Sequence, residues 1–494
     1  MSKIDSNRVK EWFSNPYNAG MVLIALAAFI IRLIFYLKTQ NQALWWDEAE
    51  YLSTAKSWAF GVPYDYNPQR PPLFQAISAL AFLIGLGEGF IKFALVLLPS
   101  VALVISIYYL AKEMFNERVG LMSSIFASVS WTFLFWTSRV QPDFFSMTFQ
   151  VLSILFMWKF WKGAGNKFSI YAGIFAALGF YFKVSALLVP VAFMVYILIK
   201  DRLEGFKIKG HYYFAIAFIV TLIPYMIWSM ALFGNPFAFK QNYSIAFTEE
   251  VARPLGWYNV QFLYLLTEGL FFILFAVAAL ASMKWIFYPD VLMKDRKKCF
   301  NPNIFAVITI LLVSAFYIFY IRGTEDRWVF LWLPFMAMFA SQTLDFIYSK
   351  FGKDQRRVAI AIVVLLIGIC SYSQLNHASQ LIEQKIPSYM PVKNAGLWVN
   401  QNYDSNTKLL SISYTQSVYY SEVNVSTYST ISDPDAFNDY IGTVGAKLVQ
   451  VSAWEQHPQW INEWISQNSN NLVPVFTDSK SASESPTVII FEVK

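Results

Sequence analysis

Charged side chains are scarce in this chain of 494 residues, at 14%, whereas an ordinary soluble domain carries about 25%. Cysteine and histidine are scarcer still, with two and three residues. Cys299 lies in a lysine-rich segment and Cys370 in an apolar run, so no disulfide is expected, and the isolated histidines lack zinc-ligand spacing. These shortages exclude a cytosolic globular enzyme, a disordered protein and a disulfide scaffold.

Apolar residues make up 56% of the chain, and the mean hydropathy is +0.42. Many of them form stretches of about 17–25 residues, the length that crosses a bilayer as a helix. The stretches are 19–38, 92–111, 119–137, 144–161, 168–184, 185–200, 212–233, 262–284, 303–321, 328–348 and 358–375. The sequence therefore predicts an α-helical polytopic membrane protein with about 11 transmembrane helices.

Lysine and arginine are unevenly distributed between the loops. The N-terminus and every second loop hold 21 of them, and the intervening segments hold ten. The positive-inside rule then places the N-terminus in the cytoplasm and Asp47, Asp143, residues 234–261 and Arg327 outside. Residues 72–87 are apolar but short, so we expect in-plane or partly re-entrant helices in this first exterior loop.

The composition changes near residue 375. Residues 376–494 hold six lysines against eleven acidic residues, whereas the remainder holds 32 basic and 21 acidic residues. Strand-like runs at 408–412, 447–451 and 488–493 alternate there with helix-like stretches. We predict a transmembrane catalytic domain at 1–375 and a small exterior α/β domain at 376–494. The net charge of +6 then reflects membrane topology, and no nucleic-acid partner is expected.

The first charged cluster of the predicted exterior face is Trp45-Trp46-Asp47-Glu48-Ala49-Glu50-Tyr51, directly after the first span. Its pattern indicates an amphipathic helix at the membrane interface. On local pattern alone, Asp47 is interpreted as an N-cap, with Glu50 completing a capping box. A second interpretation stays open, since tryptophans would hold these carboxylates in a low-dielectric interface.

Four more charged clusters lie on the same predicted face. They are Arg70 between prolines, Arg139 before Pro142-Asp143, Lys183 at a span end, and the segment from Arg322 through Glu325 to Arg327. Taken singly, Arg70 fits a snorkelling arginine at a helix end, Asp143 fits helix capping and the last segment fits a solvated loop. Taken together, they supply what glycosyl transfer from a phosphate leaving group requires. A carboxylate removes the proton of the acceptor hydroxyl, and cations stabilise the departing phosphate.

Five motifs follow one another in a fixed order along residues 20–350. They are Asp47-Glu48-x-x-Tyr51, Arg70-Pro71-Pro72-Leu73, Glu88 with Leu98-Pro99-Ser100, Arg139 with Pro142-Asp143, and Arg327-Trp328 with Pro334. This ordered set resembles that of the GT-C glycosyltransferases that use polyprenyl-phosphate sugars, in the group of protein O-mannosyltransferases and lipid A aminoarabinose transferases. Two positions depart from that group, where Arg70 replaces a lysine and Trp328 replaces a tyrosine.

The resemblance implies a GT-C-like fold and a single displacement that inverts the anomeric carbon. By resemblance, Asp47 is the catalytic base and Glu48 its catalytic neighbour, which shapes the acceptor site. Arg70, Lys183 and Arg327 would engage the lipid-linked phosphate, with Asp143 ordering them. The predicted substrate-binding residues are Tyr51, Arg70, Lys92, Arg139, Asp143, Lys183, Glu325 and Arg327. No cofactor is implied with certainty, and a requirement for a divalent metal stays open.

The predicted function is transfer of a sugar from a polyprenyl phosphate carrier, dolichyl or undecaprenyl, to a hydroxyl on the outer face of the membrane. The enzyme would be a mannosyltransferase-like hexosyl- or pentosyltransferase of a prokaryotic cell membrane, and its acceptor would be a protein, a glycolipid or a glycan. Two alternatives stay open, namely a multi-span secondary transporter and a catalytically inactive relative that serves as an assembly partner. Arg32 is the main ionisable residue within a span and could be a local snorkeller.

Overall fold

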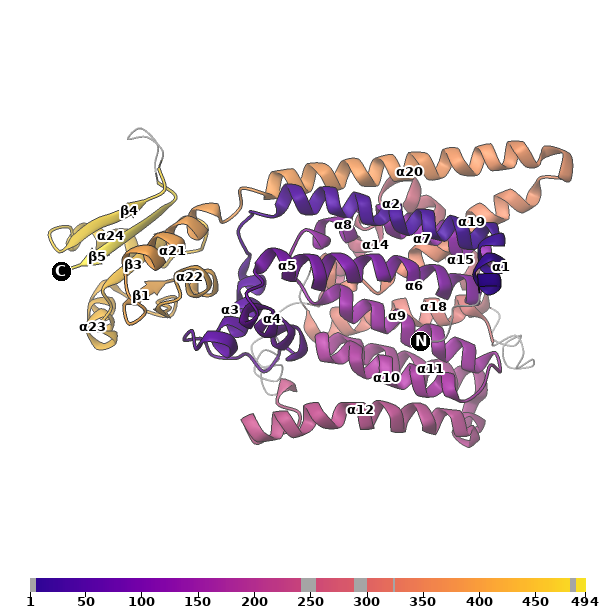
Figure 1. Ribbon diagram of the computed structural model, residues 1–494, viewed down its shortest axis with the longest axis horizontal. Helices are drawn as coiled ribbons and strands as arrows, with labels where there is room; N and C mark the ends of the chain where they lie inside the picture. The colour runs from indigo at the N-terminus through magenta and orange to yellow at the C-terminus, as the bar shows by residue number, and fades with distance from the viewer. Residues whose placement is uncertain (1–5, 241–254, 288–299, 323–324, 480–485) are drawn as a thin grey trace.

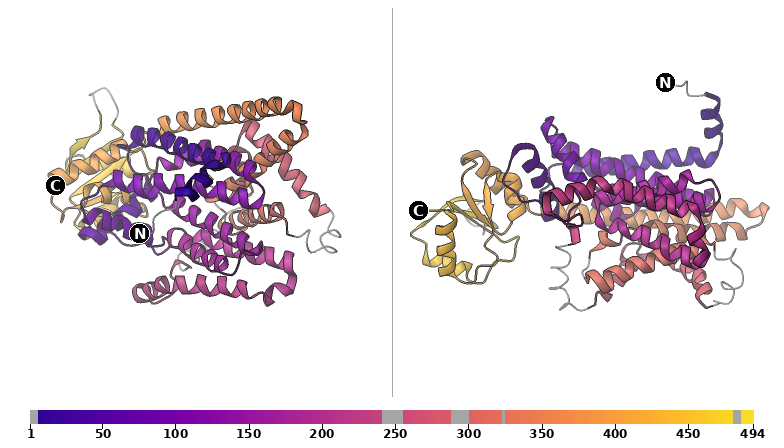
Figure 2. Two further views of the ribbon diagram at one scale, coloured as in Figure 1. Left: turned by 45° about the vertical axis from the view of Figure 1, so that its right-hand side comes forward. Right: turned by 90° about the horizontal axis from the view of Figure 1, so that it is seen from below.

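The computed structural model describes residues 6–240, 255–287, 300–322, 325–479 and 486–494. A long bundle of helices carries a small α/β domain at one of its ends (Figure 1). Figure 1 shows α1 (Ser6–Ser14) at the opposite end of the bundle, and the right view of Figure 2 agrees. The end next to the small domain is called the domain end below.

The bundle consists of helices of very different lengths. Up to residue 233 the further α-helices are α2 (Pro16–Thr39), α3 (Trp46–Phe60), α4 (Leu73–Leu83), α5 (Glu88–Lys92), α6 (Leu98–Met114), α7 (Glu117–Val129), α8 (Trp131–Thr137), α9 (Asp143–Trp161), α10 (Lys167–Phe182), α11 (Leu188–Asp201) and α12 (Lys209–Phe233). They are followed by α14 (Phe262–Leu265), α15 (Gly269–Phe287), α18 (Pro302–Ala315), α19 (Trp332–Lys350) and α20 (Arg356–Lys385).

Seven helices of the described residues are long and apolar enough to cross a membrane, and nine do so if each bent pair counts as one span. The bent pairs are α7 with α8, at 52°, and the segment through α14 with α15, at 111°. The other two predicted spans correspond to α10, which has only 16 residues, and to α19. The prediction of a polytopic helical membrane protein is confirmed.

The loop that follows the first span contains two short helices, α3 and α4. With 11 residues and a rise of 1.5 Å per residue, α4 is about 16 Å long and covers only half of the hydrocarbon core. Both helices lie between the bundle and the small domain (Figure 1). α4 is thus too short to cross the bilayer, as expected for residues 72–87.

Arg32 does not snorkel towards the membrane surface. Its side chain is fully buried, and its guanidinium donates to Ser100 Oγ at 2.9 Å and to the carbonyl of Ser128 at 3.0 Å. Ser100 belongs to α6, whereas the carbonyl of Ser128 lies where α7 ends and the chain bends into α8, so this carbonyl lacks a helical partner. Arg32 therefore donates hydrogen bonds to the carbonyls that the break between α7 and α8 leaves without partners. The interpretation of Arg32 as a snorkelling residue is wrong.

The small domain is built on a five-stranded sheet with the order β2-β1-β3-β5-β4. Its strands are β1 (Lys408–Ser411), β2 (Asn424–Ser426), β3 (Leu448–Ser452), β4 (Leu472–Thr477) and β5 (Val488–Val493), with helices α21 (Met390–Asn402), α22 (Tyr414–Ser421), α23 (Pro434–Val444) and α24 (Ile461–Gln467). β1 pairs in parallel with both β2 and β3, whereas β5 is antiparallel to β3 and β4. The predicted domain boundary at residue 375 falls inside α20, which continues to Lys385.

Hydrogen bonds hold the small domain against the domain end of the bundle. Lys56 Nζ of α3 donates to the carbonyl of Tyr419 at 2.8 Å, and the backbone N–H of Leu44 donates to Tyr420 Oη at 2.8 Å. Tyr64 stacks on Tyr414, with ring centroids 5.6 Å apart. Because α22 follows β1 directly, these contacts turn the carboxyl ends of the parallel strands towards the bundle.

Candidate active site

The first turn of α3 places Asp47 at the domain end of the bundle. The helix begins after Trp45, whose backbone N–H donates to Glu48 Oε2 at 2.6 Å. Glu48 therefore satisfies the helix N-terminus, and the interpretation of Asp47 and Glu50 as a capping box is wrong. The side chain of Asp47 is left free to contact residues outside its own helix.

Two guanidinium groups flank Asp47. Arg70 Nη2 donates to Asp47 Oδ1 at 2.7 Å, and Arg327 Nη2 donates to Asp47 Oδ2. Burial raises the pKa of Asp47, but the charges of Arg70, Arg327 and Lys183 together outweigh it and lower that pKa to about 2. With 19% of its side chain exposed, Asp47 is an accessible, ionised carboxylate held between cations.

A second carboxylate orients Arg70. Glu50 Oε2 accepts from Arg70 Nε at 3.1 Å and from Nη2 at 2.8 Å, and Glu50 Oε1 accepts from Asn67 Nδ2 at 2.7 Å. Arg70 Nη1 donates to the hydroxyl of Tyr51 at 3.3 Å, and its guanidinium lies 5.2 Å from the centre of that ring. Such a bidentate pair fixes the direction of the guanidinium.

Arg327 is held from its other side by Glu325 and Trp136. Its Nε lies 2.7 Å from Glu325 Oε1, and its guanidinium carbon lies 5.0 Å from the centre of a Trp136 ring. Burial raises the pKa of Glu325, against the opposing charge of Arg327. The indole of Trp136 also donates to Asp326 Oδ2 at 3.0 Å, which ties this segment to α8.

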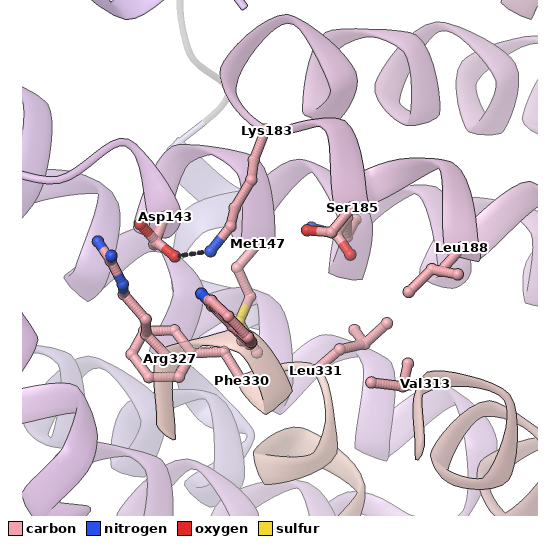
Figure 3. A pocket seen from close by; sticks show the side chains of 11 residues that line it. Asp143, Met147, Lys183, Ser185, Leu188, Val313, Arg327, Phe330 and Leu331 are labelled. Atoms are coloured by element: carbon pink, nitrogen blue, oxygen red, sulfur yellow. Dashed lines mark hydrogen bonds and ion pairs between the residues drawn. The ribbon is translucent and has the colours of Figure 1, made fainter. Parts of the chain in front are cut away.

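Lys183 pairs with Asp143. A partner for Lys183 was expected, because an unpaired cation at the end of a span is costly. Its Nζ donates to Asp143 Oδ1, and Figure 3 shows both groups beside Arg327 in one pocket. Asp143 opens α9, and Lys183 follows the last residue of α10. Three cationic groups thus converge near Asp47 from separate parts of the chain, namely Arg70, Lys183 and Arg327.

Glu48, Arg139 and Lys92 lie behind this site and line neither cleft that contains Asp47. Glu48 and Arg139 form an ion pair in which each side chain is 1% exposed, and Glu48 also accepts from the backbone N–H of Val140. Lys92 Nζ donates to the carbonyl and the hydroxyl of Thr39, each at 2.9 Å. Glu48 and Arg139 thus support the start of α3, and Lys92 supports the end of α2. Direct contact of Glu48, Arg139 or Lys92 with substrate is not supported by this geometry.

Two clefts meet at Asp47, Glu325 and Arg327, which line both of them. The first, of about 400 Å³, is cationic and is lined by Arg70 and Lys183, and by Tyr317 and Trp328, whose rings stack 5.5 Å apart. Its wall includes the π-helical turn Phe316–Ile321, a geometry that is frequent at functional sites. The second, of about 500 Å³, is rich in aromatic residues and lies against the small domain.

The acidic side chains of the site pair with cations rather than with one another. In the described part of the chain, no group of three or more His, Cys, Asp or Glu residues is placed to hold a metal ion. His211, His377 and His457 accordingly contact other partners, among them Glu268 for His377.

Sequence reasoning missed Glu50 as a residue of the site. The signal was present, because Asp47 and Glu50 are three residues apart and share one face of a helix. The same spacing fits a capping box, because the sequence pattern does not locate the first residue of α3 to within two positions. Gln69, Ser185 and Tyr317 also line the cationic cleft and gave no signal in the sequence.

The short helices after the first span, and an acidic residue that faces a cationic cleft, agree with the resemblance to GT-C glycosyltransferases. Residues 69–228 match the family model described as dolichyl-phosphate-mannose-protein mannosyltransferase. The resemblance to GT-C glycosyltransferases is thereby confirmed. No curated protein sequence matches the chain.

Three solved structures share this fold at low sequence identity. ArnT from Cupriavidus metallidurans, bound to undecaprenyl phosphate, has a TM-score of 0.70 at 11% identity over 95% of this chain and 97% of its own. The oligosaccharyltransferase AglB from Archaeoglobus fulgidus, bound to an inhibitory peptide and a dolichol-phosphate, has a TM-score of 0.65 at 11% identity over 90% and 70%. The arabinofuranosyltransferase AftD from Mycobacteria has a TM-score of 0.57 at 13% identity over 95% and 40%.

Proposed function

We propose that this protein is an inverting glycosyltransferase that moves a sugar from a polyprenyl phosphate, dolichyl or undecaprenyl, to an acceptor hydroxyl. The observation that carries the proposal is Asp47, an ionised carboxylate at the junction of a cationic cleft and an aromatic cleft. A carboxylate in this position can reach an acceptor in one cleft and a donor in the other. The transferred sugar would be a hexose, as in mannosyltransferases, or a pentose.

The chemistry follows from the charges around Asp47. The acceptor hydroxyl gives its proton to a carboxylate oxygen of Asp47 while its oxygen attacks the anomeric carbon of the donor sugar. The bond between that carbon and the phosphate oxygen breaks, and the electron pair leaves with the phosphate. Arg70, Arg327 and Lys183 stabilise the charge that develops there. One displacement from the opposite face inverts the anomeric centre.

The donor phosphate would also activate the base. In the free protein the two guanidinium groups stabilise the ionised form of Asp47 and make it a weak base. A bound phosphate competes for Arg70 and Arg327 and adds negative charge beside Asp47. Both effects raise the pKa of Asp47, so it gains proton affinity only when a donor is present.

This coupling predicts different acid limbs for two kinetic parameters. Between pH 8 and pH 4, kcat/KM for the donor is expected to stay flat, because Asp47 with a pKa of about 2 remains ionised in the free protein. The kcat profile should fall at a pH above that pKa, because the bound phosphate raises the pKa of Asp47 in the complex. Initial rates across this range test the coupling, and coincident acid limbs would contradict it.

The cationic cleft is expected to determine affinity for the lipid phosphate. Lys183→Met or Arg70→Gln should weaken binding of polyprenyl phosphate by about 10-fold or more, since each removes a charge-assisted contact of about 1.5–3 kcal/mol. Lys393→Met is the matched control, because Lys393 bonds the carbonyl of Asn41 and lines neither cleft. Native mass spectrometry in nanodiscs would measure the affinities, and equal binding by all variants would contradict this assignment.

We further propose that the domain end faces the outside of a prokaryotic cell membrane and that the N-terminus is cytoplasmic. The support is the excess of lysine and arginine in alternate loops. Cysteine scanning with a membrane-impermeant label, at positions in the small domain and in α1, would test this orientation. Labelling of α1 but not of the small domain in intact cells would reverse it.

A comparison of glycans, glycolipids and glycoproteins by mass spectrometry, in cells with and without the gene, tests the function. Loss of one glycosylated product, restored by the wild-type gene but not by Asp47→Asn, is expected. Counterflow of a substrate in liposomes without covalent product would indicate the alternative of a secondary transporter. Restoration by Asp47→Asn would indicate the alternative of an inactive relative that acts as an assembly partner.

A further inference from the structure

The aromatic cleft beside Asp47 is formed jointly by the bundle and the small domain. Trp46 and Trp136 line it from the bundle, and Tyr389 and Trp454 line it from the other side. Tyr389 and Trp454 pack together with ring centroids 5.4 Å apart. Trp46, the first residue of α3, is 42% exposed, although Glu48 two residues later is buried. Broad aromatic faces are thus presented to a space of about 500 Å³.

Three buried polar atoms of residues that line this cleft have no hydrogen-bond partner within the described residues. Gln141 is 2% exposed, yet its Oε1 has none, and the same is true of the buried indole nitrogens of Trp45 and Trp454. All three residues line the cleft. A buried polar atom without a partner costs about 1–3 kcal/mol. An acceptor and two donors in one cleft therefore indicate a ligand that carries hydroxyl groups.

The sheet of the small domain directs its ligand-binding edge into the same cleft. The chain leaves β1 for β2 on one side and returns to β3 on the other side, so β1 and β3 form a topological switch point. Ligands of open α/β sheets bind beyond the carboxyl ends of the strands at such a point. Trp454 follows the end of β3 by two residues and lines the cleft.

Tyr389 adds an independent sign of a functional site. Its φ is +61°, in the left-handed region that bulky residues rarely adopt. Strain of this kind costs about 1–3 kcal/mol and concentrates at ligand sites, where the surrounding structure imposes it. Here it turns the tyrosine ring at the start of α21 against Trp454.

We propose that this cleft binds the acceptor, and that the acceptor is a carbohydrate whose ring stacks on Trp46, Tyr389 or Trp454 with one hydroxyl directed at Asp47. The inference rests on the glycosyltransferase function proposed above. The C–H bonds on one face of a pyranose ring carry partial positive charge, which the negative face of an aromatic ring attracts. The hydroxyls at its rim match the free acceptor of Gln141 and the free indole donors.

A polypeptide acceptor fits the cleft less well. One common mode by which an extended peptide binds is pairing with an exposed strand at a sheet edge. The edge strands of the sheet are β2 and β4, and no residue of either lines the cleft. The cleft offers ring faces and isolated polar atoms, which suit a glycan or the sugar headgroup of a glycolipid.

The test uses the full-length chain in nanodiscs with a glycan array and a library of Ser/Thr peptides as probes. Wild type should bind a subset of glycans, and Trp46→Ala and Trp454→Ala should each weaken that binding at least 10-fold. Trp58→Ala is the matched control, because Trp58 lies on α3, is 39% exposed and lines neither cleft. Binding of peptides alone, binding of neither probe, or equal glycan binding by all variants would overturn the proposal.

Binding of polyprenyl phosphate, measured in the same nanodiscs, separates the two proposals. We expect Trp46→Ala and Trp454→Ala to bind it as wild type does, because the lipid phosphate belongs to the other cleft. If wild type binds polyprenyl phosphate but no glycan, the inference about the acceptor fails and the proposed function stands. If wild type binds no polyprenyl phosphate, the proposed function itself fails.

Discussion

Asp47→Asn is expected to lower the rate of sugar transfer by about 10²- to 10⁴-fold, the usual contribution of general base catalysis. The asparagine keeps the size of the side chain and can accept a hydrogen bond from one of the two arginines through its amide oxygen, whereas its amide nitrogen only donates. It accepts no proton from an acceptor hydroxyl. Transfer assays with the purified variant and its native acceptor fraction would measure the loss. A rate equal to wild type would remove Asp47 from the role of base.

Affinity for polyprenyl phosphate should change in the opposite direction in the same variant. Asp47 is an anion that shares both arginines with the donor phosphate, so its neutralisation removes a competitor and a repulsive charge. Asp47→Asn should therefore bind polyprenyl phosphate as tightly as wild type or more tightly. Asp65→Asn, at a carboxylate that lines neither cleft, should leave both the rate and the affinity unchanged. Weaker lipid binding by Asp47→Asn would indicate a folding defect.

Glu48→Ala is expected to destabilise the protein by about 3–5 kcal/mol, because it leaves the buried charge of Arg139 without its partner. Both side chains are 1% exposed, and Glu48 also accepts from the N-terminus of α3. Equilibrium unfolding in mixed micelles would measure the change. Replacing both residues by methionine should recover much of the loss, because an apolar pair carries no charge to desolvate.

The exposed pair of Lys38 and Glu383 provides the control. Its atoms are 2.8 Å apart, but the side chains are 45% and 54% exposed. Glu383→Ala should lower the free energy of unfolding far less than Glu48→Ala does, as expected for an ion pair in water. If Glu48→Ala and Glu383→Ala lower the free energy of unfolding equally, burial does not make the pair of Glu48 and Arg139 more important for stability.

The sequence placed Glu48 beside Asp47 and so predicted a catalytic role for it. The structure instead places Glu48 in a buried ion pair with Arg139. Adjacent residues on a helix point about 100° apart, so Asp47 and Glu48 cannot face the same space. Which of the two faces the cleft depends on where α3 begins and how it packs against Arg139, and neither is encoded in the motif itself. Lys92 is a similar case, because its cation faces Thr39 instead of the cleft.

The sequence by itself determined the class of protein and the short set of charges that form its site. Charged residues make up only 14% of the chain, and this scarcity drew attention to Asp47, Arg70, Lys183 and Arg327. Only the tertiary structure decided which charges meet, because Asp47 and Arg327 are 280 residues apart and form their ion pair only when the chain has folded. It also created the aromatic cleft, since Trp46 and Trp454 come from parts of the chain that no local pattern connects.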